Sequence, residues 1–222
     1  MDQPTIAPSP RGLLKEQAYA ELRRRILDGS LAGGDFLSER RLAEVLNMSK
    51  TPIKAALERL EHEGLIVVSP QQGIVVRELT IREIADQFEL RKALEGHVVR
   101  SMAGRLTPDQ LAPLAHNLDA QSAAAQLADV ARLVDLDATF HLLLCQTFGN
   151  AAITACLAEH RARMHRVIFQ VMSQVAGRLP QAVAEHQAIF AAIRDGRDEQ
   201  AVQLIQQHLE FGKQFLLASR WD

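Results

Sequence analysis

The sequence contains little that would suit a membrane-spanning, secreted or disordered protein. Of 222 residues, 2 are cysteine, 12 glycine and 8 proline, which excludes collagen-like and low-complexity chains. No apolar run approaches the roughly 18 residues that cross a bilayer, and the start MDQPTIAPSPRG lacks the apolar core of a secretory signal. With 47% hydrophobic and 23% charged residues, the composition is that of a globular protein. Cys145 and Cys156 lack paired metal-ligand spacing, so we expect free buried thiols in a reducing cytoplasm.

An excess of one charge is also missing. The net charge is −2, and dividing the chain after Arg77 leaves 11 basic and 10 acidic residues in front, with 14 and 17 behind. A global positive field is therefore excluded. Any contact with nucleic acid must come from locally placed basic residues.

The front third of the chain predicts a short arm and a small α+β domain. Residues 1–12 hold three prolines and predict a flexible arm. Residues 13–77 then predict a helix from Leu14 that stops at Gly29, and a short helix over 38–46 between Ser38 and Asn47. A third helix over 50–63 follows, and two β-like runs at 65–68 and 74–76 predict a hairpin.

The remainder, residues 78–222, predicts helices alone. Turn signals separate six periodic segments, at 81–105, 108–127, 130–147, 150–175, 180–195 and 198–219. The expected fold is mainly α, an N-terminal winged helix-turn-helix (α+β) followed by an antiparallel all-α helical bundle.

The arrangement of the front helices favours DNA binding. Burying the apolar stripes leaves the start of helix 50–63 projecting, with Lys50, Thr51 and Lys54 off the buried face and Arg40 nearby. A helix N-terminus carrying lysines can meet phosphates and base edges in the major groove. A solvated charged face is the alternative reading of the same residues.

The stretch LSERRLAEVLNMSKTPIKAALERLEHEGLIVVSPQQGIVV, with the helix before it, resembles the winged helix of GntR-type bacterial transcription regulators. The resemblance covers about 60 residues without a gap. It implies that residues at the matching positions touch the operator and that Gly73 lies at the wing tip; the matching residues are Arg40, Ser49, Lys50, Thr51 and Lys54. Lysine stands at 50 and 54 where arginine is usual, and lysine cannot form arginine's two-pronged contact with guanine.

Four side chains in the rear half have spacing that suits a metal site. Asp137 and His141 are four residues apart on one helix and so share a face. His186 and His208 each lie 11 residues from position 197, in the turn of a predicted antiparallel helix pair, and so fall at equal height. One carboxylate and three imidazoles suit Zn²⁺, Ni²⁺ or Mn²⁺. Five other histidines lack this spacing, namely His62, His97, His116, His160 and His165.

The segment DLDATFHLLLCQTFGN resembles the Asp-x-x-x-His motif of the ligand-binding FCD domain in the FadR branch of the GntR family. AEHQAIFAAIRDGRDEQAVQLIQQHL is similar to the closing helix pair of that domain, and six helices match its smaller, VanR-like subtype. The resemblance implies a divalent metal on the same four residues, with open positions for a small carboxylate effector. It also implies that Arg91 faces the effector, with Arg163 a weaker candidate; an exposed Arg91 paired to Glu95 is the alternative.

These observations lead to one main hypothesis and two alternatives. We expect a cytoplasmic, homodimeric DNA-binding regulator, a repressor and not an enzyme, whose rear domain binds a small organic acid through a metal. Effector binding would change the angle between two winged helices on operator DNA. The first alternative is a regulator for which the cation itself is the signal. The second is a metal-dependent hydrolase, which leaves the front 77 residues without a role and lacks an obvious general base.

Overall fold

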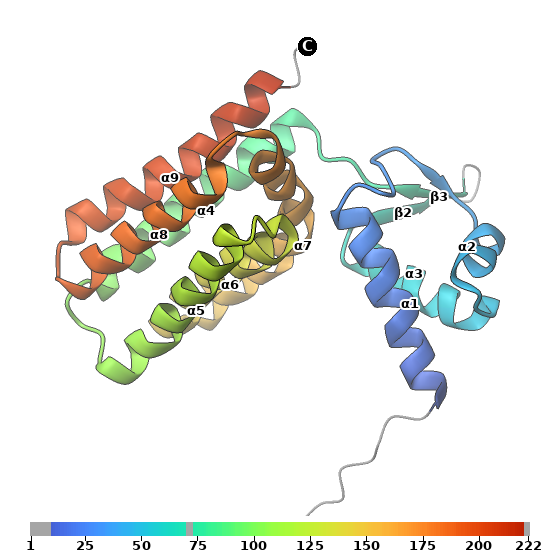
Figure 1. Ribbon diagram of the computed structural model, residues 1–222, viewed down its shortest axis with the longest axis horizontal. Helices are drawn as coiled ribbons and strands as arrows, with labels where there is room; N and C mark the ends of the chain where they lie inside the picture. The colour runs from blue at the N-terminus through green and yellow to red at the C-terminus, as the bar shows by residue number, and fades with distance from the viewer. Residues whose placement is uncertain (1–9, 70–72, 220–222) are drawn as a thin grey trace, which may run out of the picture. The chain divides into compact units, whose positions relative to one another are not determined.

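The computed structural model describes the backbone of residues 10–69 and 73–219, with side chains for all of these except 10–12, 160–163 and 216–219. The chain divides between residues 78 and 79 into two compact units (Figure 1). We call them the front unit and the helical unit. The division lies one residue from the boundary expected from the change in sequence pattern.

The front unit consists of three helices and a small antiparallel sheet. In chain order its elements are α1 (Pro10–Leu27), β1 (Phe36–Leu37), α2 (Glu39–Leu46), α3 (Lys50–His62), β2 (Ile66–Ser69) and β3 (Gly73–Val76). Helix α3 packs against both α1 and α2, and the fully buried Leu22, Ile26, Ile53 and Leu60 form the centre of that packing. Burial of these side chains is the main stabilising contribution in the unit.

Local sequence explains where α2 begins and ends. The Ser38 hydroxyl accepts a hydrogen bond from the backbone N–H of Arg41, which satisfies one free donor of the first turn. Asn47 closes the helix in the left-handed conformation, with φ 51°. Asparagine tolerates that conformation better than most residues. Both ends follow the sequence prediction.

The sheet differs from the predicted hairpin by one strand. In the described residues the strand order is β1-β3-β2, and β1 pairs with β3 through Phe36↔Val75 and Leu37↔Ile74. A strand of two residues is too short to show alternation, so the sequence pattern did not reveal it. Helix α1 also starts at Pro10, inside the predicted arm, since proline is tolerated in a first helical turn. Residues 1–9 of that arm lie outside the described residues.

The described residues of the helical unit form six helices close to the predicted ranges. They are α4 (Ile81–Met102), α5 (Pro108–Gln126), α6 (Val130–Phe148), α7 (Ala151–Gln174), α8 (Arg178–Arg194) and α9 (Asp198–Ser219). Capping boxes begin α4 at Thr80–Glu83 and α5 at Thr107–Gln110, and Gly149 ends α6 with φ 84°. The predicted fold class, a winged helix-turn-helix followed by an all-α bundle, is confirmed.

The helices of the helical unit pack in a ring, and the buried apolar side chains among its described residues form two clusters. Helix α4 contacts α9, α9 contacts α8, α8 contacts α5, α5 contacts α6 and α6 contacts α7 (Figure 1). Phe88, Phe140, Leu114 and Ile189 are among the fully buried side chains. Both cysteines are free thiols. Within the described part of the chain, no helix is long and apolar enough to span a membrane.

Candidate functional sites

Four buried side chains from three helices converge inside the helical unit. Asp137 and His141 come from α6, His186 from α8 and His208 from α9. One ligand atom of each lies within 4.8 Å of the corresponding atoms of the other three. The Nε2 atoms of His186 and His208 are 3.2 Å apart, as their equal offsets from the α8–α9 turn predict. Two ligands about 2.1 Å from one ion are at most about 4.2 Å apart, so a small contraction would suit a common cation.

Each imidazole is oriented by a hydrogen bond at its Nδ1 atom. Glu95 Oε2 lies 2.5 Å from His141 Nδ1, Gln121 Oε1 lies 2.8 Å from His186 Nδ1, and Glu185 Oε2 lies 2.6 Å from His208 Nδ1. Because ionised carboxylates and amide oxygens only accept hydrogen bonds, each Nδ1 carries a hydrogen and donates. The Nε2 lone pairs are thereby left facing the centre of the cluster, the arrangement typical of metal-ligating histidines.

A chain of amides fixes the orientation of the Gln121 side chain. Gln121 Nε2 donates to Asn117 Oδ1 at 2.7 Å, and Asn117 Nδ2 donates to the backbone carbonyl of Leu136 at 3.2 Å. A backbone carbonyl can only accept, so each amide in the chain has one possible direction. The Gln121 oxygen must therefore face His186, which sets the tautomer of that ring.

Hydrogen-bond acceptor atoms meet at the centre of the cluster, and Asp137 Oδ1 and His141 Nε2 have no donor there among the described residues. Asp137 Oδ1 lies 3.5 Å from His186 Nε2 and 4.0 Å from His208 Nε2, and these atoms are all acceptors. Asp137 Oδ1 and His141 Nε2 are buried and lack a hydrogen-bond partner among the described residues. Buried polar atoms without a partner are costly, and converging lone pairs repel. A cation at this point would satisfy all four atoms, so the donor set fits a borderline divalent metal.

Two arginines balance the carboxylates around the cluster. Arg91 Nε donates to Glu95 Oε1 at 2.8 Å, and Arg178 forms a two-pronged pair with Glu185 at 2.7 and 2.8 Å. Together with Asp137, three carboxylates face two guanidinium groups, which leaves one net negative charge when the imidazoles are neutral. A divalent cation would change this balance to one net positive charge.

Burial and ion pairing act in opposite directions on the pKa values of the two carboxyl groups beside the cluster. Burial raises the pKa of Glu95, but the charge of Arg91 and the hydrogen bonds from His141 and Arg91 outweigh it and bring the pKa to about 2. The pKa of Glu185 falls to about 2 as well, because bonds from His208 and Arg178 outweigh its burial. Burial lowers the pKa of His186 well below its usual value and lowers that of His208. Both rings are therefore neutral and able to bind a metal at neutral pH.

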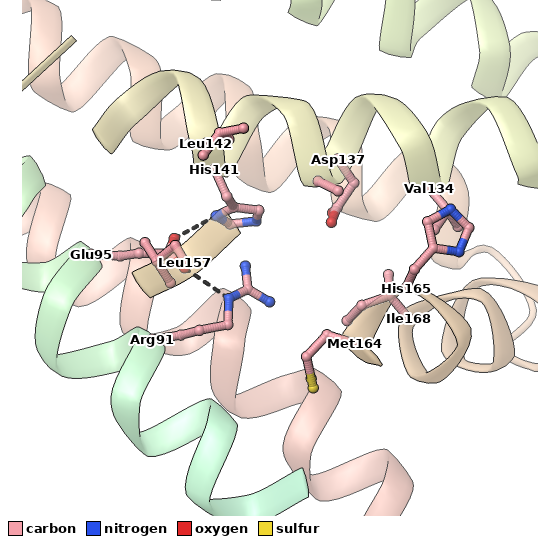
Figure 2. Close-up of a pocket in the computed structure, with 11 residues that line it drawn as sticks. Arg91, Glu95, Val134, Asp137, His141, Leu142, Leu157, Met164, His165 and Ile168 are labelled. Atoms are coloured by element: carbon pink, nitrogen blue, oxygen red, sulfur yellow. Dashed lines mark hydrogen bonds and ion pairs between the residues drawn. The ribbon is translucent and has the colours of Figure 1, made fainter. Parts of the chain in front are cut away.

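Two small cavities border the cluster. The larger, about 50 Å³, is lined by Arg91, Asp137 and His141 at one end and by apolar side chains such as Leu157, Met164 and Ile168. Figure 2 shows the terminal nitrogens of Arg91 pointing into the space between His141 and Asp137. The smaller cavity, about 20 Å³, shares Arg91, Asp137 and Ile168 with the larger and is also lined by Arg178 and His208.

Arg91 lies at the larger cavity and is not the exposed arginine of the alternative interpretation. It pairs with Glu95 four residues on, but the pair is buried and its free nitrogens face the larger cavity. The side chain of Arg163 lies outside the described residues. His165 lines the larger cavity, is buried, and contacts Asp135 through Nε2 at 3.0 Å.

The sequence analysis did not identify the residues that orient the three clustered histidines. These are Glu95, Gln121, Glu185 and the arginine partner Arg178. The sequence signal that could have identified them is a polar residue within an otherwise apolar helix face. Glu95 is fully buried on α4, for example, a position that charged residues rarely occupy unless they are paired.

Three of the predicted DNA-contacting residues line one exposed hollow of the front unit. Lys50, Thr51 and Lys54 are exposed and line a hollow of about 330 Å³ at the start of α3, together with Lys15 of α1. Ser49 occupies the N-cap of α3 without using its side chain as a cap. The sequence did not indicate Lys15.

Two further predicted DNA contacts lie outside that hollow. The Arg40 side chain is 83% exposed in the first turn of α2. Gly73 starts β3 in the left-handed conformation, with φ 81°, and pairs with Ser69 at the exposed end of the hairpin.

Comparison with known protein families accounts for both units. The family model "Bacterial regulatory proteins, gntR family" matches residues 14–76, and the FCD domain model matches residues 86–211. The resemblances seen in the sequence are thus confirmed. The family and its named relatives are transcriptional regulators, not enzymes, and the hydrolase alternative is wrong.

Individual relatives agree with the family match over most of the chain. The HTH-type transcriptional repressor RspR of Escherichia coli strain K12 is 29% identical over 204 residues, 91% of this chain and 88% of that protein. The solved structure of E. coli McbR/YncC superposes with a TM-score of 0.75 at 22% identity, covering 94% of this chain and 99% of that one. A GntR regulator from Rhodococcus sp. RHA1 gives a TM-score of 0.76, also at 22% identity, covering 92% and 97%. This chain belongs to the GntR family of bacterial regulatory proteins, in the branch with an FCD domain, and is a DNA-binding transcriptional regulator.

Proposed function

We propose that this regulator is a metal-dependent sensor of a small carboxylate and that it represses transcription as a homodimer. The observation that carries the proposal is the convergence of Asp137, His141, His186 and His208 within 4.8 Å, with acceptor atoms facing inward. The repressor RspR, similar over nine tenths of this chain, supports the direction of regulation.

The front unit supplies the operator-binding surface of the proposal. The N-terminal turn of α3 enters the major groove, where Ser49, Lys50, Thr51 and Lys54 contact phosphates and base edges. Arg40 adds a charge from the first turn of α2, and Gly73 lets the wing backbone approach the adjacent groove. Since the chain carries no overall positive charge, these local contacts carry the affinity.

The helical unit supplies the sensor. Asp137, His141, His186 and His208 would hold a divalent cation, Zn²⁺, Ni²⁺ or Mn²⁺, and that cation would supply a Lewis acid for a carboxylate. The free guanidinium nitrogens of Arg91 face the same cavity and bind that carboxylate from the other side. The net positive charge of a metal-loaded site favours a ligand with one negative charge.

Operator binding is tested by mobility shift with the intergenic DNA upstream of the gene. We expect a shift that weakens with salt and is abolished by Lys54→Glu. Arg132→Glu, an exposed charge reversal on the helical unit, is the matched control and leaves the shift intact. A Lys54→Glu protein that binds as well as the wild type would remove α3 from the interface.

Metal and effector binding are tested on the same full-length protein by thermal denaturation. We expect Zn²⁺, Ni²⁺ or Mn²⁺ to raise Tm in the wild type and not in His186→Gln. A ligand at a hundred times its Kd stabilises by about 2.7 kcal/mol, which is readily measured. Release of the operator on chelation alone would instead favour the cation as the signal. An unchanged Tm with all three metals would contradict the sensor proposal.

A further inference from the structure

Arg178 combines full burial with an unused hydrogen-bond donor. It is the first residue of α8 and only 2% exposed, and both its terminal nitrogens are held by the carboxylate of Glu185. Its Nε atom is buried without a partner among the described residues. The ring of Phe211 lies under the guanidinium group at 4.2 Å and limits its movement. A buried donor of this kind costs free energy unless something accepts its hydrogen bond.

Arg178 lies at one of the two cavities beside the four clustered side chains. Arg178 lines the smaller cavity together with Arg91, Asp137 and His208. Arg91 and Asp137 also line the larger cavity, so the two spaces adjoin at the metal-site carboxylate. A ligand bound between Arg91 and the metal site can therefore extend a second group toward Arg178.

The size of the cavities limits what that ligand can be. A buried water needs roughly 10–15 Å³ of such volume, so the larger cavity holds about four waters and the smaller about one or two. The space fits an acid of about three or four carbons with one small second group. Met164, Ile168 and Val171 form much of the apolar part of the lining, and the small volume excludes the longer chain of a sugar acid.

The charge balance decides the nature of the second group. With a divalent cation, the site carries one net positive charge, which a single carboxylate neutralises. The charge of Arg178 is already balanced by Glu185. A second carboxylate would thus enter a buried site without an opposing charge, which is unfavourable. A hydroxyl or keto oxygen can accept from Nε without adding charge.

We propose that Arg178 is a specificity-determining residue and that the effector is a three- or four-carbon hydroxy or oxo acid. Its carboxylate binds on the side of Arg91, and its second oxygen accepts a hydrogen bond from Arg178 Nε. This inference rests on the proposed carboxylate sensor and names the ligand class of that site.

The test compares matched acids by isothermal titration of the full-length protein loaded with Zn²⁺. The pairs are butyrate against 3-hydroxybutyrate and propionate against lactate, with succinate as the dicarboxylate. We expect the hydroxy acid of at least one pair to bind about tenfold or more tightly than its parent, as one hydrogen bond to a charged donor provides, and succinate to bind more weakly than that hydroxy acid.

The matched variant is Arg178→Lys, which keeps a positive charge beside Glu185 but lacks the Nε donor. We expect the ratio of the two affinities within each pair to fall to about one in this variant, whatever the change in the absolute affinity of the parent acid. The inference is overturned if the two acids of each pair bind the wild type with equal affinity, or if succinate binds more tightly than the hydroxy acids. It is also overturned if Arg178→Lys retains the preference for the hydroxy acid. The wild-type comparison needs no variant to fold. If none of the acids binds the wild type, the carboxylate sensor itself fails; if all bind without preference, only the role of Arg178 fails.

Discussion

Glu95 on α4 accepts a hydrogen bond from His141 on α6, with Oε2 2.5 Å from Nδ1. The other oxygen of the same carboxylate accepts from Arg91 Nε at 2.8 Å. One fully buried side chain therefore holds the imidazole of His141 and the arginine that faces the cavity. The proposed metal site and the proposed effector cavity are thus linked through a single residue.

Replacement of Glu95 by glutamine is expected to weaken metal binding by about 10–100-fold, the usual effect of losing a carboxylate behind a ligating histidine. The amide is a weaker acceptor and leaves the His141 ring less firmly oriented. Competition between the protein and a chromophoric chelator for Zn²⁺ measures the change. Glu199→Gln, which breaks an exposed pair with Arg100, is the control and leaves the affinity unchanged. Equal affinities for both variants would contradict the orienting role.

Stability of the metal-free protein is expected to fall as the pH is lowered, in two stages. His186 has a lowered pKa because it is buried, so below about pH 6.5 the unfolded chain takes up a proton that the folded chain does not. This costs about 1.4 kcal/mol per pH unit. Glu95, whose pKa falls from 4.5 to about 2, stabilises fully above pH 4.5 and loses about 3 kcal/mol as the pH falls toward 2.

Urea unfolding at pH 7.0 and 5.5 checks the first stage of this acid dependence. Replacing His186 with glutamine should reduce the difference in unfolding free energy between the two pH values. His116→Gln, at an exposed position, should leave that difference as in the wild type. A pH dependence that is identical in all three proteins would show that burial of His186 does not contribute.

The order of the helices and the convergence of the four candidate metal ligands were predictable from the sequence because both follow from periodicity. The offsets of His186 and His208 from the α8–α9 turn place their Nε2 atoms 3.2 Å apart, a relation that helical geometry alone supplies. Glu95 and Gln121 were not predictable in the same way. Their contacts join α4 to α6 and α5 to α8, and the pairing of helices that are not consecutive depends on packing of the whole ring.

Strand β1 was not predictable for a different reason, because two residues are too few to show a periodic pattern. Phe36 and Leu37 are extended because they pair with β3, about 40 residues later in the chain, and not because of their own preference. The same dependence on distant partners explains why Lys15 was missed, since only the packing of α1 against α3 brings it beside Lys50 and Lys54.

Operator binding should lose part of its salt dependence when a phosphate-contacting lysine is removed. For Lys54→Ala, we expect the slope of log K against log salt to decrease by about one, since each neutralised phosphate contributes about 0.9. Fluorescence anisotropy with labelled operator between low and moderate salt gives this slope. Lys15→Ala is expected to act in the same way, whereas Arg132→Ala on the helical unit should not change it. A slope that Lys54→Ala leaves untouched would place this lysine away from the phosphates.

The turn after α4 and the turn between α8 and α9 meet through two glycines. Gly104 has φ +69°, and a Cβ atom there would lie 3.0 Å from the Cα of Gly196, which itself has φ +72°. The backbone N–H of Gly104 also donates to the carbonyl of Ile193 at 2.8 Å. Moving either turn away from the other would break this hydrogen bond. A side chain at position 104 would therefore cause both backbone strain and a steric clash.

Gly104→Ala is therefore expected to destabilise the helical unit by about 1–3 kcal/mol, as judged from strained positive-φ positions. Gly96→Ala is the matched control, because Gly96 lies within α4 and an added Cβ would meet its nearest neighbour, Gln206 Nε2, at an ordinary 3.7 Å. There alanine favours the helix, and we expect stability equal to the wild type or higher by about 0.5–1 kcal/mol. Urea unfolding followed by far-UV circular dichroism measures both. If the two alanines changed the unfolding free energy alike, the close contact between the turns would not limit stability.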